Sequence, residues 1–204
     1  MKDLRLRYSK ASPYARKVRI VAHELDLAHR LELISTDTWN LPDALLNENP
    51  LGKVPSLSTG DDGIIYDSSV ICEYLASLKH PNELFPEAGP QRWRALRLQA
   101  LGDGMMDAAV ECFAERNFRP PEQQSDPWIE RMKASVTRAL DYLERVCDSE
   151  LADLTIGAIA VASALGYLDL RFAEDRWRAG RPELSRWFEA FSRRPSFVGT
   201  KVGA

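Results

Sequence analysis

The sequence predicts a two-part fold, in which an α/β domain is followed by an all-helical domain. Alternating apolar and charged residues, which are typical of strands, occur only before residue 80. Beyond a stretch at 80–90 that contains three prolines and a glycine, apolar residues recur at helical spacing. We therefore expect an α/β domain over 1–79, a linker over 80–90 and a helical domain over 91–204.

The first elements predict a strand–helix–strand unit. Residues 4–8 alternate and predict a strand, and residues 30–34 predict a second one. Between them lies a helical pattern with buried positions at Val18, Val21 and Leu25. We expect the second strand to be parallel with the first, and the right-handed crossover rule then makes a strand–helix–strand unit of the first thirty-odd residues. A short helix is expected at 42–46, before Pro50 and Gly52 interrupt the pattern.

Ser12 and Pro13 stand at the start of the first helix. Serine is favoured at the N-cap, and proline is tolerated next because its missing N–H would be unpaired there. A helix N-terminus offers backbone N–H groups and a dipole that stabilise a thiolate or another anion. Ser-Pro helix starts are also common as simple caps. The residues themselves leave both interpretations open.

Val54 and Pro55 precede a predicted strand at 56–58, which the turn Asp61-Asp62-Gly63 joins to a partner strand at 64–66. Proline cannot donate to a ladder, so Pro55 belongs at the start of the strand. A cis bond at Pro55 would leave the Val54 N–H and C=O free for a ligand, although most X-Pro bonds are trans.

Asp67 and Ser68 predict the start of another helix, with apolar residues at helical spacing behind them. This start offers a second anion site, beside a carboxylate that suits an ammonium group. The alternative is a capped helix with a solvated acid.

The helical half shows a stripe from Trp93 to Ala108 and another from Ile129 to Val146. Residues 154–168 are apolar nearly all round, but they are too few and too interrupted to span a bilayer, so we expect a buried central helix. Residues 182–191 predict a last helix, which Pro195 closes.

Composition excludes several classes of function. The 204 residues are 45% hydrophobic and 28% charged, with a net charge of −3, so neither nucleic acid nor a membrane is expected as a partner. Met1 is followed by alternating charges, so we expect no signal peptide. Three widely separated cysteines favour a reducing cytoplasm, and Cys72 is expected to pack in a core. The three histidines have no metal-ligand spacing and are expected on the surface.

Three motifs resemble those of cytosolic glutathione transferases, and the resemblance covers the whole chain. They are Ser12-Pro13-Tyr14-Ala15-Arg16-Lys17, Asn49-Pro50-Leu51-Gly52-Lys53-Val54-Pro55 and Asp67-Ser68, in the family's order and spacing. The resemblance is to a bacterial member with a serine-type active site. It implies a thioredoxin-like N-terminal domain that binds glutathione. It also implies a helical C-terminal domain that supplies most of the pocket for an electrophile.

The resemblance implies roles for the motif residues. Ser12 would donate a hydrogen bond to the glutathione sulfur and lower the thiol pKa, acting as the catalytic residue. Val54 would pair its main chain with the cysteinyl part of glutathione, which requires a cis bond at Pro55. Asp67 and Ser68 would hold the γ-glutamyl end.

The sequence departs from the family pattern at several positions. Asn40 stands where serine-type classes place a lysine, which weakens or replaces one contact to a glutathione carboxylate, whereas Lys53 matches a residue that contacts the glycine carboxylate. The capping box of the helical domain is half present, with Thr155 but with Ala158 in place of an aspartate. Ser9 is close enough to compete with Ser12 for the thiol.

A second-substrate pocket is expected from Tyr14 and from apolar residues of the helical half. Methionine and aromatic side chains repack around varied ligands, although such residues are also common in cores. The candidates in the helical half are Met105, Met106, Phe113, Phe118, Trp128 and Tyr167. Asp103 and Asp107 would reach the glutathione amino group or be hydrated.

The function that these expectations favour is glutathione transfer to a small hydrophobic electrophile by a cytoplasmic homodimer. Glutathione is a co-substrate, and no metal or redox cofactor is implied. One alternative is a non-catalytic binding or regulatory protein that reuses the fold. Another is a glutathione-dependent isomerase, dehalogenase or peroxidase. Thiol–disulfide exchange is disfavoured, because that chemistry uses a cysteine where Ser12 stands.

Overall fold

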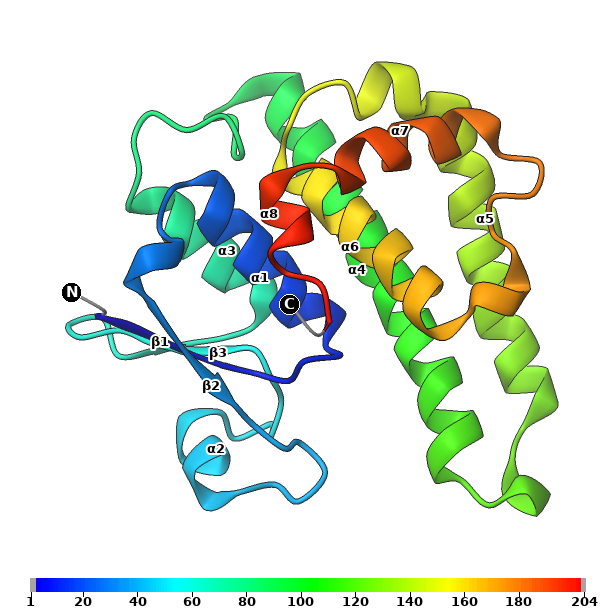
Figure 1. The fold of residues 1–204 in the computed structure, drawn as a ribbon, viewed down its shortest axis with the longest axis horizontal. Helices are drawn as coiled ribbons and strands as arrows, with labels where there is room; N and C mark the ends of the chain where they lie inside the picture. The colour runs from blue at the N-terminus through cyan, green and yellow to red at the C-terminus, as the bar shows by residue number, and fades with distance from the viewer. Residues whose placement is uncertain (1–2, 203–204) are drawn as a thin grey trace. The chain divides into compact units, whose positions relative to one another are not determined.

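A computed structural model describes residues 3–202 and divides the chain into two compact units. The first unit runs up to Phe85 and takes in the chain again from Arg194, and the second comprises Pro86–Arg193 (Figure 1). The return of the C-terminal residues to the first unit was not expected from the sequence. The limits 1–79, 80–90 and 91–204 remain a proposal.

The first unit contains a four-stranded mixed sheet in the order β2-β1-β3-β4. Its strands are β1 (Leu4–Tyr8), β2 (Leu31–Ser35), β3 (Ser56–Ser58) and β4 (Ile64–Ile65). As predicted, β1 and β2 are parallel, and β3 forms an antiparallel hairpin with β4. Because β3 also pairs antiparallel with β1, the sheet has the mixed thioredoxin-like order that the resemblance implied.

Alternation along β1 separates the two faces of this sheet. Leu4 and Leu6 are buried, on the side where α1 (Pro13–Glu24) and α3 (Ser68–Ser77) lie against each other (Figure 1). Arg7 points to the other face, where it forms an ion pair of 2.8 Å with Glu48 at the end of α2 (Asp43–Glu48). A short 3₁₀ helix at Ala28–Arg30 precedes β2.

The C-terminal segment is fixed to α1 by two arginines. Arg194 donates to both carboxylate oxygens of Glu24, at 2.8 and 2.9 Å. The hydrogen bond from Arg194 outweighs the effect of burial, so the pKa of Glu24 is lowered. Arg16 lies 3.8 Å from the ring centre of Phe197 in α8 (Pro195–Val198) and donates to its carbonyl oxygen at 3.1 Å. These contacts hold α8 against α1.

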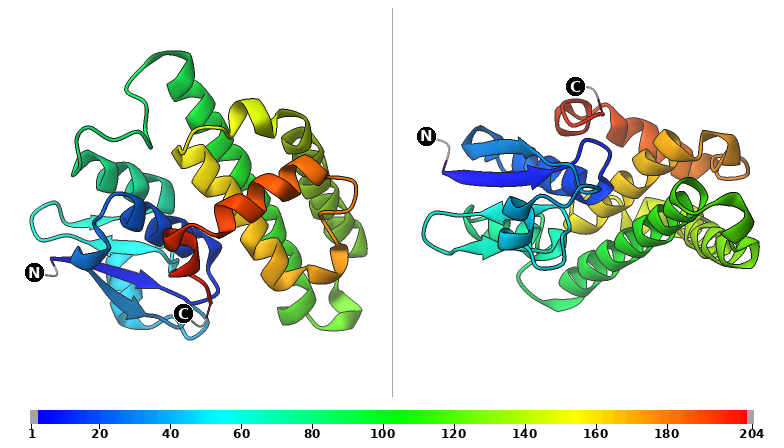
Figure 2. Two further views of the ribbon diagram at one scale, coloured as in Figure 1. Left: turned by 45° about the horizontal axis from the view of Figure 1, so that its top comes forward. Right: turned by 90° about the horizontal axis from the view of Figure 1, so that it is seen from below.

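The second unit is all helical, as predicted. Its helices are α4 (Gly89–Phe118), α5 (Asp126–Glu150), α6 (Ile156–Arg171) and α7 (Pro182–Ser192), with 3₁₀ turns at Pro121–Gln123 and Ala173–Asp175. Helix α4 packs against both α5 and α6 (Figure 2). Helix α6 is buried along residues 156–168, which confirms the central helix expected there.

The buried face of α4 differs from the predicted stripe. Trp93 is 69% exposed, whereas the residues that face inward include Ala95, Leu98 and Gly102. A Cβ on Gly102 would lie 2.6 Å from the Ala160 carbonyl carbon, so α4 and α6 approach each other too closely for a larger residue there. The spacing of large apolar residues does not predict this face, because the contact with α6 requires small residues.

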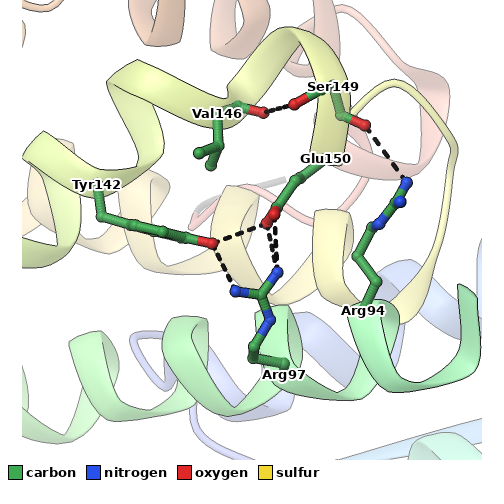
Figure 3. Close-up of polar contacts among 6 residues, drawn as sticks. All are labelled: Arg94, Arg97, Tyr142, Val146, Ser149 and Glu150. Carbon is green, nitrogen blue, oxygen red and sulfur yellow. Dashed lines mark hydrogen bonds and ion pairs between the residues drawn. The ribbon is translucent and has the colours of Figure 1, made fainter. Parts of the chain in front are cut away.

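A polar cluster joins α4 to α5 (Figure 3). Arg97 donates to both carboxylate oxygens of Glu150 at 2.8 Å and to the Tyr142 hydroxyl at 2.6 Å. Burial raises the pKa of Glu150, but the hydrogen bonds from Arg97 and Tyr142 together outweigh it, so the pKa is lowered. The Arg97 guanidinium is thus held by two groups of α5.

Within residues 3–202, no helix is long and apolar enough to cross a membrane. The same residues contain no group of three or more His, Cys, Asp or Glu side chains placed to hold a metal ion. His23, His29 and His80 are exposed and Cys72 is buried, as expected.

Candidate functional site

The pairing of β1 with β3 brings the first two motifs to one end of the sheet. Arg7 near the end of β1 pairs with Ser56, the first residue of β3. Because these strands are antiparallel, the chain that leaves β1 towards Ser12 lies beside the chain that enters β3 from Val54. The helix start and the Val54 main chain are therefore neighbours at this end of the sheet.

The pairing of β3 with β4 adds the third motif to the same end. Leu57 pairs with Ile65, the last residue of β4, so Asp67 follows β4 at the end where β3 begins. Helix α3 starts immediately afterwards at Ser68. The sheet registers thus gather all three motifs.

Ser12 has the geometry of an N-cap. Its backbone is extended, with φ −70° and ψ 118°, and its side-chain oxygen accepts the Ala15 N–H at 3.2 Å. Pro13 occupies the first turn, as predicted. The Ser9 carbonyl accepts the Ser12 N–H at 3.1 Å, so Ser9 belongs to the turn that presents Ser12. A hydroxyl that accepts one hydrogen bond still has its proton to donate to an anion over the helix end.

The Val54-Pro55 peptide bond is cis, as the resemblance implied. Asn49 is 2% exposed and supports this loop, because its amide donates to the Lys53 carbonyl at 2.9 Å and its side-chain oxygen accepts the Leu51 N–H at 3.0 Å. Among residues 3–202, no hydrogen bond engages the main-chain N–H or C=O of Val54. Both groups are therefore available to an extended peptide.

Asp67 is the N-cap of α3. Its carboxylate is exposed and accepts the Ser69 N–H at 3.0 Å, whereas Ser68 is only 3% exposed. The Tyr66-Asp67 peptide bond is also cis. An exposed carboxylate beside a helix N-terminus offers one group for an ammonium and another for a carboxylate.

Lys17 supports the site, although no sequence motif predicted a role for it. It is 0% exposed, and its ammonium donates to the Ser69 hydroxyl at 3.4 Å. This contact joins the helix that Ser12 starts to the helix that Asp67 starts. Its position between Tyr14 and Val21 on the apolar stripe of α1 was the available signal, because a lysine there must be buried.

Asn40 and Lys53 lie in exposed segments of the same unit. The Asn40 amide donates to an Asp37 carboxylate oxygen at 2.6 Å, and the Trp39 N–H donates to the other oxygen at 2.9 Å. The hydrogen bond from the Trp39 backbone N–H and the one from the Asn40 side-chain amide both lower the pKa of Asp37. Asn40 is thus engaged within its own loop.

The residues expected for a second-substrate pocket have different environments. Met105 and Met106 are core side chains at 2% and 0% exposure. Phe113 is half-buried, and its ring packs edge-on against that of Phe118, with 5.9 Å between the two ring centres. Phe118 and Trp128 line an open surface cavity at the connection between α4 and α5. Tyr14, in the first unit, is half-buried.

Comparison with protein families assigns both parts of the chain. Residues 11–78 match the N-terminal domain of glutathione S-transferase, and residues 126–190 match its C-terminal domain. The chain belongs to the glutathione S-transferase family. The matched N-terminal segment contains all three glutathione motifs, from Ser12 to Ser68.

Individual family members are similar along nearly their whole length. The uncharacterized GST-like protein YibF of Escherichia coli K12 is 33% identical over 196 residues, which are 95% of this chain and 96% of YibF. A glutathione transferase family member from Pseudomonas fluorescens Pf-5, solved with bound glutathione, is 40% identical, with a TM-score of 0.94 over 97% of this chain and 98% of that one. A structure from the same organism with bound S-(propanoic acid)-glutathione is 39% identical, with a TM-score of 0.87 over 97% and 96% of the two chains.

Proposed function

We propose that this chain is a glutathione transferase that joins the glutathione thiolate to a small electrophile with an apolar body. The observation that carries the proposal is the gathering of the Ser12 helix start, the unpaired Val54 main chain and the Asp67 helix start at one end of the sheet. A γ-glutamyl tripeptide needs a partner for its backbone, one for its charged amino-acid end and one for its sulfur. The Val54 main chain suits the backbone, the Asp67 helix start suits the charged end, and the Ser12 helix start suits the sulfur.

In this proposal Ser12 is the catalytic residue. Its hydroxyl donates a hydrogen bond to the glutathione sulfur, and the dipole of α1 adds to the stabilisation, so that a thiolate is present near neutral pH. Ser12 forms no covalent bond. The rate arises from a preformed nucleophile and from the proximity of the two substrates.

The other proposed contacts position the rest of glutathione. The Val54 main chain pairs with the cysteinyl residue, next to Pro55, and Asp67 with Ser68 holds the γ-glutamyl end. Lys53 binds the glycine carboxylate, and Asn40 contributes less than a lysine would, because its amide is engaged by Asp37. For the electrophile we retain Tyr14, Met105, Met106 and Phe113. Met105 and Met106 are buried, so they would shape the pocket by supporting the residues that line it.

The similar proteins support this proposal. Glutathione is bound in the P. fluorescens Pf-5 structure, and the second structure from that organism holds a glutathione thioether. A thioether is the chemical form in which a conjugation product leaves. Transfer to an electrophile is therefore the reaction that we assign to this chain.

We also propose that the protein is a cytoplasmic homodimer. Each unit exposes a large apolar side chain of the kind that subunit contacts bury, Val70 at 52% in α3 and Trp93 at 69% in α4. Light scattering should give twice the mass of one chain, which is 23.0 kDa. A mass of one chain at micromolar concentration would contradict the dimer.

The Ser12→Ala variant tests the catalytic assignment. Losing one hydrogen bond to a charged sulfur costs roughly 1.5–3 kcal/mol, so kcat should fall about 10- to 100-fold and the pKa of bound glutathione should rise. Calorimetry should show nearly unchanged glutathione affinity, because Val54 and Asp67 remain. Ser9→Ala is the matched control, since it removes the other hydroxyl of the same loop. Full activity of Ser12→Ala, or loss of activity in Ser9→Ala instead, would refute the assignment.

A further inference from the structure

The helical unit contains a cavity of about 230 Å³ between α4, α5 and the end of α6, which we call the helical cavity. Residues 172–181, the orange connection from α6 to α7 in Figure 1, supply its remaining wall. All the residues that line it belong to Pro86–Arg193, so it lies within one compact unit. Its lining does not include Met105, Met106 or Phe113, which are proposed for the electrophile.

The wall of the helical cavity is apolar and formed by side chains that are at most 9% exposed: Val136, Leu140, Leu168, Phe172 and Trp177. Its two rings are held in place by their neighbours. Phe172 packs edge-on against Tyr167, with 6.4 Å between the ring centres. Trp177 packs edge-on against Phe188 at 5.8 Å, and its ring N–H donates to Asp169 at 2.8 Å. An apolar cavity of about 150 Å³ binds benzene, so the helical cavity has room for a substituted ring.

The charged groups beside the helical cavity are already paired. The Lys133 ammonium lies 2.7 Å from a carboxylate oxygen of Asp175, and the Arg181 guanidinium lies 2.6 Å from one of Asp141. The Thr137 hydroxyl, also in the lining, donates to the Lys133 carbonyl at 3.0 Å. Because each of these cations has an acid beside it, an ionic ligand would lose hydration here without gaining an unpaired partner. The surroundings therefore favour an uncharged ligand.

We propose that the helical cavity binds a small uncharged aromatic molecule that carries one hydrogen-bonding group. The ring of the ligand lies against Phe172 and Trp177, because aromatic pairs gain from edge-on and offset contacts. Its polar group reaches the ion pair, where Lys133 has three donors and gives one to Asp175. This site goes beyond glutathione transfer and does not depend on it, because the three glutathione motifs lie in the other unit.

Benzyl alcohol, benzoate and benzylammonium form a suitable test set, because they share a ring and differ in charge. Calorimetry should give a dissociation constant of roughly 0.1–1 mM for benzyl alcohol, in the range that so small a ligand can reach. Benzoate and benzylammonium should each bind at least about tenfold more weakly, because of their lost hydration. The absence of binding of benzyl alcohol, or equally tight binding of either ion, would overturn the proposal.

The Ala109→Leu variant locates the ligand, because Ala109 lines the helical cavity and a leucine would fill part of it. Its affinity for benzyl alcohol should fall at least about tenfold, since a packed interior has no spare space for both groups. Ala114→Leu is the matched control: it makes the same change on α4 but lines the cavity at the connection between α4 and α5. It should leave the affinity unchanged. Wild-type affinity in Ala109→Leu, or an equal loss in both variants, would contradict the assignment.

Thiol protection tests the site in the wild-type protein, without a substitution in the core. Cys112 lines the helical cavity and Cys147 does not, yet both are 1% exposed and burial raises the pKa of both thiols. Benzyl alcohol at about ten times its dissociation constant leaves roughly one site in eleven empty, so labelling of Cys112 by 4,4′-dithiodipyridine should slow about tenfold. Peptide mass spectrometry should show labelling of Cys147 at an unchanged rate. Equal slowing of both thiols, or of neither, would refute binding in this cavity.

Discussion

The Lys17 ammonium lies 3.4 Å from the Ser69 hydroxyl, inside the first unit. Lys17 is in the second turn of α1 and Ser69 in the first turn of α3. Because Ser12 and Asp67 cap these two helices, the contact sets the spacing between the proposed thiol end and the proposed γ-glutamyl end of glutathione. A fully buried lysine is costly to desolvate, and its hydrogen bond to Ser69 offsets part of that cost while it holds the two helix starts together.

We predict that Lys17→Met weakens glutathione binding and lowers stability. The change keeps the volume but removes the donor to Ser69, which should cost about 1–3 kcal/mol and lower Tm by several degrees. Glutathione affinity measured by calorimetry should fall roughly three- to tenfold, because the helix starts are no longer joined. Lys79→Met, at an exposed position just after α3, is the control. Wild-type affinity in Lys17→Met would show that the contact does not position the site.

We predict that the link between Glu24 and Arg194 makes stability depend on pH in the acid range. The hydrogen bond from Arg194 lowers the pKa of Glu24 below its unfolded value of about 4.3. The stabilisation is therefore fully present above that value and is lost as pH falls through the folded pKa. Because Arg194 is 39% exposed and partly screened, we expect a contribution of about 1 kcal/mol at neutral pH.

Thermal denaturation of Glu24→Gln as a function of pH checks this linkage. The difference in Tm from the wild type should be constant between about pH 7 and pH 5 and should shrink below about pH 4. Glu83→Gln, at an exposed position in the loop after α3, should show no such trend. A Tm difference that persists unchanged into strong acid would mean that the ion pair is not its origin.

Local signals were sufficient to predict the elements of the first unit. The alternating residues predicted β1, the Ser12-Pro13 pair predicted α1, and Asp67 predicted α3. Each element begins in the structure at the residue where it was expected to begin. The fold as a whole was predicted because these elements follow one another in a family order. The gathering of the motifs depends on two sheet registers: the hairpin between β3 and β4 follows from a local turn, whereas the pairing of β1 with β3 joins segments far apart in the sequence and is seen only in the structure.

Features that depend on tertiary contacts were not predictable from one sequence. The buried face of α4 is set by the close approach to α6 at Gly102, which no periodicity of large apolar residues reveals. The return of Arg194 and α8 to α1 depends on pairing with Glu24 over a long sequence separation.

We predict that the two helix caps contribute differently to stability. Thr155 occupies the N-cap of α6, but its hydroxyl oxygen is buried and makes no hydrogen bond within residues 3–202. Thr155→Val should therefore cost less than about 0.5 kcal/mol, because no hydrogen bond is lost. Ser12→Ala removes a formed cap and should cost about 1 kcal/mol. Urea denaturation measures both. A loss of 1 kcal/mol or more in Thr155→Val would show that the hydroxyl caps the helix after all.

Two glycines of α4 should respond in opposite directions to replacement by alanine. A Cβ on Gly102 would lie 2.6 Å from the Ala160 carbonyl carbon and 2.8 Å from the Val161 nitrogen, so α4 and α6 would have to separate. Gly102→Ala should therefore destabilise the protein by about 1–3 kcal/mol. Gly104 has no atom within 4 Å of an added Cβ and is exposed, so Gly104→Ala should stabilise by roughly 0.5–1 kcal/mol through the higher helix propensity of alanine. Urea denaturation of both variants measures the contrast, and equal effects of the two substitutions would mean that the α4–α6 contact tolerates a methyl group.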